Sequence, residues 1–201
     1  KAEAEAEKKR QEQEAYGQKV AAERARVTEL EAANSPLLKQ LQFRDAIRAV
    51  KELKDELETP EAQDTAAVAL DRVNRIKDFH DYLVKTVPGY KSARRGWSVD
   101  GADAKALSVG GRKILWVDVY EKHLEIVGEL INELVANEQA TKNLRLRERT
   151  RVMTNAALCL NFFYKEIPSA QERAKALATD AARLFDIDAD TIKNLLPEFF
   201  E

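Results

Sequence analysis

Two clusters of basic residues in the middle of the chain are the residues best suited to bind another molecule. The first cluster mixes basic with aromatic side chains, a composition used for contacting phosphates and stacking on bases. The second cluster is a run of arginines whose spacing places them on two different stripes of a helix. The candidate partner-binding residues are Tyr90, Lys91, Arg94, Arg95, Trp97, Arg145, Arg147, Arg149 and Arg151.

The total charge of the chain conceals these clusters. The 201 residues include 33 basic and 35 acidic side chains, for a net charge of −2. Residues 90–151 carry 12 basic and 9 acidic side chains, whereas residues 1–89 carry 16 and 18 and residues 152–201 carry 5 and 8. A basic middle between acidic flanks favours a solvated basic face or an acidic protein partner. The acidic total disfavours nucleic acid, although binding of nucleic acid or another polyanion through the basic middle is the alternative.

The residue types that most often carry catalysis are scarce. A single cysteine, Cys159, excludes an internal disulfide and cysteine-based zinc clusters. His80 falls on an apolar helix face and is interpreted as a hydrogen-bonded core residue, and His123 has no evident nucleophile or metal partner. Cys159 lies within an apolar helical run and is expected to be a buried small hydrophobe. We therefore expect no enzyme, no catalytic residue, no cofactor and no metal site.

Residues 1–34 have the composition of a long charged helix, rich in Ala, Glu, Lys, Arg and Gln. A heptad frame places Val20 and Val27 at one core position and Tyr16 and Leu30 at the other. Glu23 occupies a core position and interrupts this frame, which spans only about two heptads. The segment is expected to be a solvated extension or stalk, and it is a candidate coiled coil for forming a homodimer.

Proline signals divide the next part of the chain into two helices. Ser35-Pro36 and Thr59-Pro60 both combine an N-cap residue with a proline suited to a first helical turn. Apolar residues recur at three- and four-residue steps after each signal, and Val87-Pro88-Gly89 ends the second run. Two helices joined this closely are expected to pack as an antiparallel hairpin.

Residues 96–117 change to the alternating pattern of strands. Gly110-Gly111 separates two of the apolar stretches and predicts a two-residue hairpin turn, since the spacing of a phosphate-binding loop is absent. We expect a three-stranded antiparallel meander, which must lie on helices because three short strands are marginal alone.

Helical patterns return after the meander. Asp118 with Glu121 and Ser169 with Glu172 resemble capping boxes and mark two helix starts. Another helix is expected from about Thr141 or Arg145 to Tyr164, and a short terminal helix over about 188–196.

The segment Thr154 to Phe185 has the length of a tetratricopeptide unit, and Ala174, Ala178 and Ala181 match the small packing positions of its second helix. The chain thus resembles tetratricopeptide-type helical hairpins over about a third of its length. The Trp-x-x-Leu-Gly start of that family is absent, and no second copy follows. The resemblance implies helical-hairpin packing and a protein-binding surface, and it assigns no catalytic residues.

Together these patterns predict a mainly α protein of class α+β. Antiparallel helical hairpins carry a β-meander inserted at about 96–117 and follow a long charged N-terminal helix. The expected organisation is an extension over 1–34 and one helical domain over 36–201. The predicted function is a protein–protein interaction or scaffold domain. The chain begins at Lys1 without an initiator methionine, so we expect either the part of an anchored protein outside the membrane, with its anchor upstream, or a cytoplasmic protein.

Overall fold

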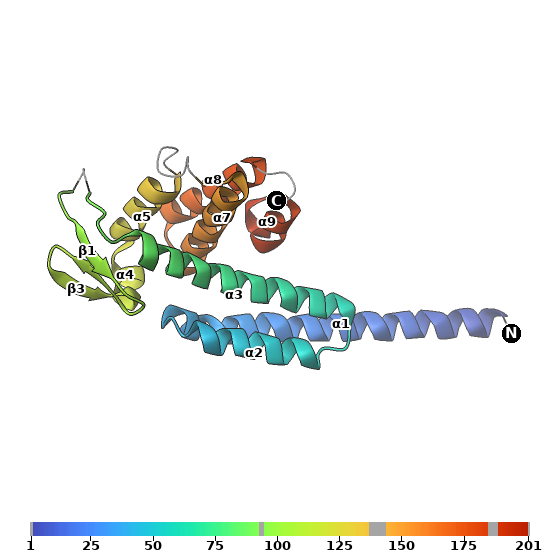
Figure 1. Cartoon of the computed structure of the whole chain (residues 1–201). Helices are drawn as coiled ribbons and strands as arrows, with labels where there is room; N and C mark the ends of the chain where they lie inside the picture. Colours follow the sequence, from blue (N-terminus) through green and yellow to red (C-terminus); the bar gives the residue numbers. More distant parts are fainter. Residues whose placement is uncertain (1, 93–94, 137–143, 185–188, 201) are drawn as a thin grey trace. The chain divides into compact units, whose positions relative to one another are not determined.

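The computed structural model describes residues 2–92, 95–136, 144–184 and 189–200 (Figure 1). The elements are α1 (Ala2–Lys39), α2 (Phe43–Glu56), α3 (Pro60–Thr86), β1 (Val99–Ala102), β2 (Ala106–Val109), β3 (Arg112–Leu115), α4 (Trp116–Lys122), α5 (Leu124–Ile131), the π-helix η1 (Asn132–Ala136), α7 (Leu146–Phe163), α8 (Pro168–Leu184), α9 (Ala189–Leu195) and the 3-10 helix η3 (Pro197–Phe199). The predicted fold class is confirmed: the chain is mainly helical, with a three-stranded antiparallel sheet inserted after a long N-terminal helix.

The chain divides into two compact units. The first consists of Lys1–Leu38 and Gln42–Val73, and the second of Lys39–Leu41 and Asn74–Glu201, so α3 contributes to both.

The core of the first unit is made of aliphatic side chains from three helices. Its buried residues are Val27, Val50, Leu57, Ala62, Ala66 and Ala69, with Leu30, Leu53 and Leu70 packed against them. Residues 5–19 of α1 are exposed, and the helix first enters this core around Glu23 and Val27. Two of the predicted heptad residues, Val27 and Leu30, therefore pack within their own chain.

Polar contacts reinforce the packing of α1 in the first unit. The Tyr16 hydroxyl donates to Glu61 Oε2 at 2.8 Å, and Lys19 pairs with Glu58. Further along the helix, Arg26 and Glu31 form ion pairs with Glu56 and Arg72, at 2.7 and 3.0 Å. These pairs are exposed or half-buried, so each adds little to the stability that the core provides.

The predicted helix start at Ser35-Pro36 is wrong, because α1 continues through Pro36 to Lys39. The break comes at Leu41, which adopts a left-handed conformation with φ 59°. The Gln42 N–H then donates to the Leu37 carbonyl at 2.8 Å, a bond that closes a helix end of the Schellman type. The second signal is confirmed, since α3 begins at Pro60 directly after Thr59.

The sheet of the second unit has the order β1-β2-β3 with both pairs antiparallel. Val109 pairs with Arg112, so Gly110 and Gly111 form the predicted two-residue turn. Both glycines have positive φ, 54° and 76°, as the favoured hairpin turn requires. The third strand is shorter than expected because Trp116 and Val117 belong to α4.

The helix predicted from Asp118 is also different from the one observed. It begins at Trp116, and Asp118 pairs with Lys122 at 2.8 Å one turn later. It ends at Lys122, since His123 has φ −124° and ψ 52°, outside the helical region, and the chain continues as α5 and η1.

Aromatic rings fill the core where the sheet meets the helices. Trp116 and Tyr120 are buried, and the Tyr120 ring stacks on Phe163 at a centroid distance of 4.3 Å. The Trp116 Nε1–H donates to the Asp103 carbonyl at 2.8 Å, which ties α4 to the turn after β1. His80 of α3 packs its ring edge against Trp116, at 5.2 Å between centroids.

Candidate anion-binding pocket

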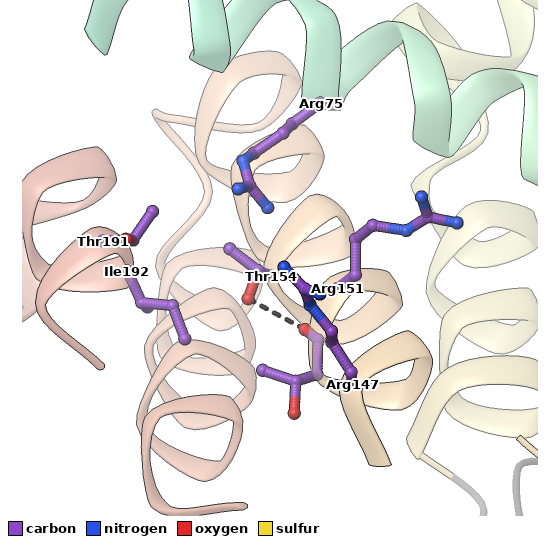
Figure 2. A pocket seen from close by; sticks show the side chains of 7 residues that line it. Arg75, Arg147, Arg151, Thr154, Thr191 and Ile192 are labelled. Atoms are coloured by element: carbon purple, nitrogen blue, oxygen red, sulfur yellow. Dashed lines mark hydrogen bonds between the residues drawn. The ribbon is translucent and has the colours of Figure 1, made fainter. Parts of the chain in front are cut away.

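A small pocket in the second unit gathers arginine and threonine side chains from α3, α7 and α9 (Figure 2). Its volume is about 110 Å³. The lining residues are Arg75, Arg147, Thr150, Arg151, Thr154, Thr191 and Ile192. None of the described residues that line it is acidic.

Most of the pocket is built from one face of α7. Thr150, Arg151 and Thr154 come three, four and seven residues after Arg147, and residues at these offsets share a helix face. The helix begins at Leu146, and Glu148 accepts a hydrogen bond from the Arg145 N–H at 3.3 Å in the manner of a capping box. The pocket therefore lies beside the first two turns of α7.

The threonine hydroxyls of α7 are occupied within the helix. The Thr150 hydroxyl donates to the Leu146 carbonyl at 3.0 Å, and the Thr154 hydroxyl donates to the Thr150 carbonyl at 2.9 Å. Each hydroxyl has one hydrogen, so neither can also donate to a ligand. The donors that α7 can offer to a ligand are consequently the guanidinium groups of Arg147 and Arg151.

The guanidinium groups differ in their direction. Figure 2 shows that Arg75 from α3 and Arg147 from α7 extend toward the same space, whereas the guanidinium group of Arg151 extends away from it. Arg75 Nη1 also lies 3.5 Å from Asn155 Oδ1, which helps to hold its direction. Arg151 lines a neighbouring pocket of about 310 Å³ together with Asp78 and Asp81. Arg147 is thus the exposed arginine of α7 that extends into the pocket.

This arrangement favours an anion. Arg147 and Arg151 are exposed arginines of α7 that line the same pocket, and their positive charge attracts an anion. The dipole of α7 adds partial positive charge at the N-terminal end of this helix.

The structure brings only part of the predicted basic set to this pocket. Arg147 and Arg151 line it, as their shared stripe predicts, and Arg145 and Arg149 do not. Arg145 is exposed before the helix, and Arg149 is half-buried. The buried Nε of Arg149 has no hydrogen-bond partner within the described part of the chain.

The first predicted cluster, around Tyr90 and Trp97, does not line this pocket and contacts α5 instead. The Tyr90 and Trp97 rings are half-buried and contact each other at 5.4 Å between centroids. Glu129 of α5 accepts a hydrogen bond from the Tyr90 hydroxyl at 3.3 Å and lies 3.6 Å from the Nε of Arg95. Partial burial and the negative charge of Glu129 raise the pKa of Tyr90 to about 12. Arg94 lies outside the described residues, and Lys91 is exposed.

Sequence reasoning missed five lining residues: Arg75, Thr150, Thr154, Thr191 and Ile192. Arg75 lies on α3, where the apolar residues beside it are expected to form the core. Its spacing in the sequence indicates no partner on α7. The polar Thr150 and Thr154 are both buried at a four-residue step on α7. Buried polar residues repeated on one helix face are a signal that could have identified this side of the pocket.

The expected core positions of His80 and Cys159 are confirmed. His80 is buried, and its Nδ1 lies 3.2 Å from the Tyr120 hydroxyl. Cys159 is buried as well, and burial raises the pKa of its thiol. Across residues 2–92, 95–136, 144–184 and 189–200, no group of three or more His, Cys, Asp or Glu side chains is placed to hold a metal ion.

Comparison of the chain with protein-family models, with curated proteins and with solved structures finds no match. The resemblance to tetratricopeptide hairpins therefore stays a prediction. Within the described residues, no helix is both long enough and apolar enough to span a membrane.

Proposed function

We propose that this chain is a non-enzymatic protein–protein interaction domain that binds an acidic partner through the arginine pocket of its second unit. The observation that carries the proposal is the pocket lining, in which three arginines occur without a carboxylate among the described residues. Arginine is enriched at protein interfaces and pairs with carboxylate and phosphate groups through two parallel hydrogen bonds. Arg147, Arg151 and Thr191 are exposed, so a partner can reach the pocket from solvent.

A binding titration with a model acidic ligand tests this proposal. The probe is a fluorescein-labelled oligoglutamate peptide, titrated with the full chain and followed by anisotropy. The double variant Arg147→Gln/Arg151→Gln removes the charges of the two exposed arginines of α7 that line the pocket. The matched control, Lys175→Gln/Arg183→Gln, removes two charges from exposed positions on α8 that do not line the pocket.

We expect oligoglutamate to bind the chain and the control variant alike, and to bind the pocket variant at least about tenfold more weakly. Equal binding by the two variants, or no binding at low salt, would contradict the proposal. A parallel titration with a labelled single-stranded oligonucleotide tests the alternative. Tighter binding of DNA, falling steeply as salt rises from about 50 to 200 mM, would favour nucleic acid instead.

The exposed first half of α1 is proposed to act as a tether for the folded domain. Residues 5–19 are exposed, while Val27 and Leu30, which the heptad frame assigned to a dimer, pack against α2 and α3. Light scattering on the full chain should therefore give the monomer mass of 22.7 kDa at every concentration. A concentration-dependent rise toward twice that mass would instead indicate the homodimer.

A further inference from the structure

We propose that a groove between α1 and α2 binds a basic amphipathic helix of a protein partner. The groove belongs to the first unit and shares no lining residue with the arginine pocket, so this second interaction surface does not depend on the proposed function. Its volume is about 440 Å³. The lining residues are Arg26, Glu29, Leu30 and Ala33 of α1 and Ala49, Glu52, Leu53 and Glu56 of α2.

The groove is formed by one face of each helix. Within α1 and within α2 alike, the lining residues come three, four and seven positions after the first of them, and residues at these offsets share a helix face. Arg26 lies 2.7 Å from Glu56, and the Asn34 side-chain amide donates to the Ala46 carbonyl at 3.3 Å. The two helices therefore run antiparallel beside each other (Figure 1), and the groove follows them for about two turns.

The floor of the groove is apolar. Leu30 and Leu53 are half-buried and pack against the core of the first unit. Ala33 and Ala49 have short side chains, which allow the backbone of another helix to come close. None of the described residues of α3 lines the groove, so a helix bound in it would cover the exposed part of both leucines and add a fourth helix to this unit.

Acidic side chains border this apolar floor. The lining contains three carboxylates and one guanidinium group, for a net charge of −2. Arg26 is already paired with Glu56 at 2.7 Å. Glu29 and Glu52 are exposed, and neither forms an ion pair within the described part of the chain. The two unpaired carboxylates therefore attract cationic side chains to the groove.

Charge and shape together specify the occupant. A partner helix with an apolar stripe at three- and four-residue steps covers the floor, and lysines or arginines beside the stripe pair with the carboxylates. Arg48, one turn before Glu52, is itself paired with Asp45 at 2.7 Å. A second copy of this chain is a poor occupant, because its exposed residues 5–19 offer only Ala6, Ala15 and Tyr16 as apolar side chains.

Fluorescence anisotropy of three labelled peptides, titrated with the full chain, tests the inference. Each peptide has about 20 residues, a length at which a helix can form. The lysine peptide has leucine and alanine along one helix face, lysine on both sides of this stripe and glutamine elsewhere. The glutamate peptide replaces every lysine by glutamate. The scrambled peptide keeps the composition of the lysine peptide in an order that abolishes the stripe.

Three variants of the chain locate the binding site. Glu29→Gln/Glu52→Gln removes the two unpaired carboxylates, and Ala33→Arg places a long cationic side chain over the floor. The matched control, Glu5→Gln/Asp64→Asn, removes two carboxylates that do not line the groove. All these positions are exposed, so the fold is retained.

We expect the native chain and the control variant to bind the lysine peptide alike, and the other two peptides at least about tenfold more weakly. Glu29→Gln/Glu52→Gln should weaken binding of the lysine peptide at least about threefold, and Ala33→Arg at least about tenfold. Binding of the scrambled peptide as tight as that of the lysine peptide would overturn the inference, because charge alone would then explain it. No binding, or equal losses in the groove and control variants, would overturn it as well.

Light scattering tests the choice of occupant. A dimer of the native chain that Ala33→Arg converts to a monomer would show that the groove binds a second copy, and would overturn the choice of a separate partner. The outcome of the oligoglutamate titration has no bearing on these results, since the variants of the arginine pocket leave the groove unchanged.

Discussion

Glu23 of α1 accepts hydrogen bonds from both the hydroxyl and the backbone N–H of Thr59, at 2.6 and 2.9 Å. The Glu58 N–H donates to the same carboxylate at 3.3 Å. Thr59 is the residue before α3, so a carboxylate from 36 residues away accepts hydrogen bonds at the N-terminal end of that helix. Only 7% of the Glu23 surface is exposed, and these donors compensate for its burial.

The first prediction concerns the pH dependence that Glu23 confers. Its hydrogen bonds to Thr59 lower the pKa of Glu23 below the ordinary value of 4.5. A carboxyl with a lowered folded-state pKa stabilises the fold above pH 4.5, and the stabilisation is lost as the pH falls through the lowered pKa. Glu23→Gln should therefore be less stable than the native chain near pH 7, and the difference should shrink toward pH 3. Urea unfolding at a series of pH values measures this, and a difference independent of pH would contradict it.

A second pH dependence is expected from His80. Burial lowers the pKa of His80 below 6.5, so the unfolded chain takes up a proton that the folded chain resists. The corresponding stability is complete above pH 6.5 and declines as the pH falls below that value. His80→Gln should flatten the pH dependence of the free energy of unfolding between about pH 7 and pH 5. His123 is present in both proteins, so an unchanged slope would show that His80 does not titrate in this way.

Small residues control the packing of α7 against α8. Ala156, Ala157, Ala174 and Ala178 are fully buried, which allows the two helices to approach closely. Ala178→Leu should cost about 1–3 kcal/mol in unfolding free energy because the added atoms have no space. Ala176→Leu places the same side chain at an exposed position of α8 and should stay within about 0.5 kcal/mol of the native chain. Similar urea midpoints for the two variants would contradict this account of the interface.

A substitution at Gly111 is expected to destabilise the hairpin turn more than a substitution at Gly110. Gly111 has φ 76°, and a β-branched residue there is strained, so Gly111→Val should lower the unfolding free energy by about 1–2 kcal/mol. Gly110→Asn gives the Asn-Gly pair that the same turn type prefers and should change stability by less than about 0.5 kcal/mol. Thermal unfolding measures the loss of stability in each of the two variants. Equal losses would contradict the expected difference between the two positions.

Local signals predicted the fold well, and distant partners explain what they missed. Gly110-Gly111 and Thr59-Pro60 each act within a few residues, and both turned out as expected. The helix start that Ser35-Pro36 predicts is absent because α1 tolerates a proline near its end. The break at Leu41 depends on a left-handed conformation that is unusual for leucine. Glu23 looked like a defect in a coiled coil because its partner, Thr59, is far away in sequence.

In the candidate site, too, local spacing predicts some of the residues, and others depend on partners that are distant in sequence. The shared stripe of Arg147 and Arg151 follows from helical spacing alone, and the structure places both in one pocket. Arg75 joins them only through the packing of α3 beside α7, which no local pattern encodes. The Tyr90–Trp97 cluster looked like an open binding segment because its partner, Glu129, lies on a different helix.

The most direct test of the central claim is where the oligoglutamate peptide binds on the folded chain. Backbone amide signals of the full chain, followed by NMR during a titration, report this position by position. The account predicts that the largest shifts occur at Arg147, Thr150, Arg151, Thr154, Thr191 and Ile192. Shifts centred on Lys91, Arg95 and Trp97, or no shifts at saturating peptide, would contradict it.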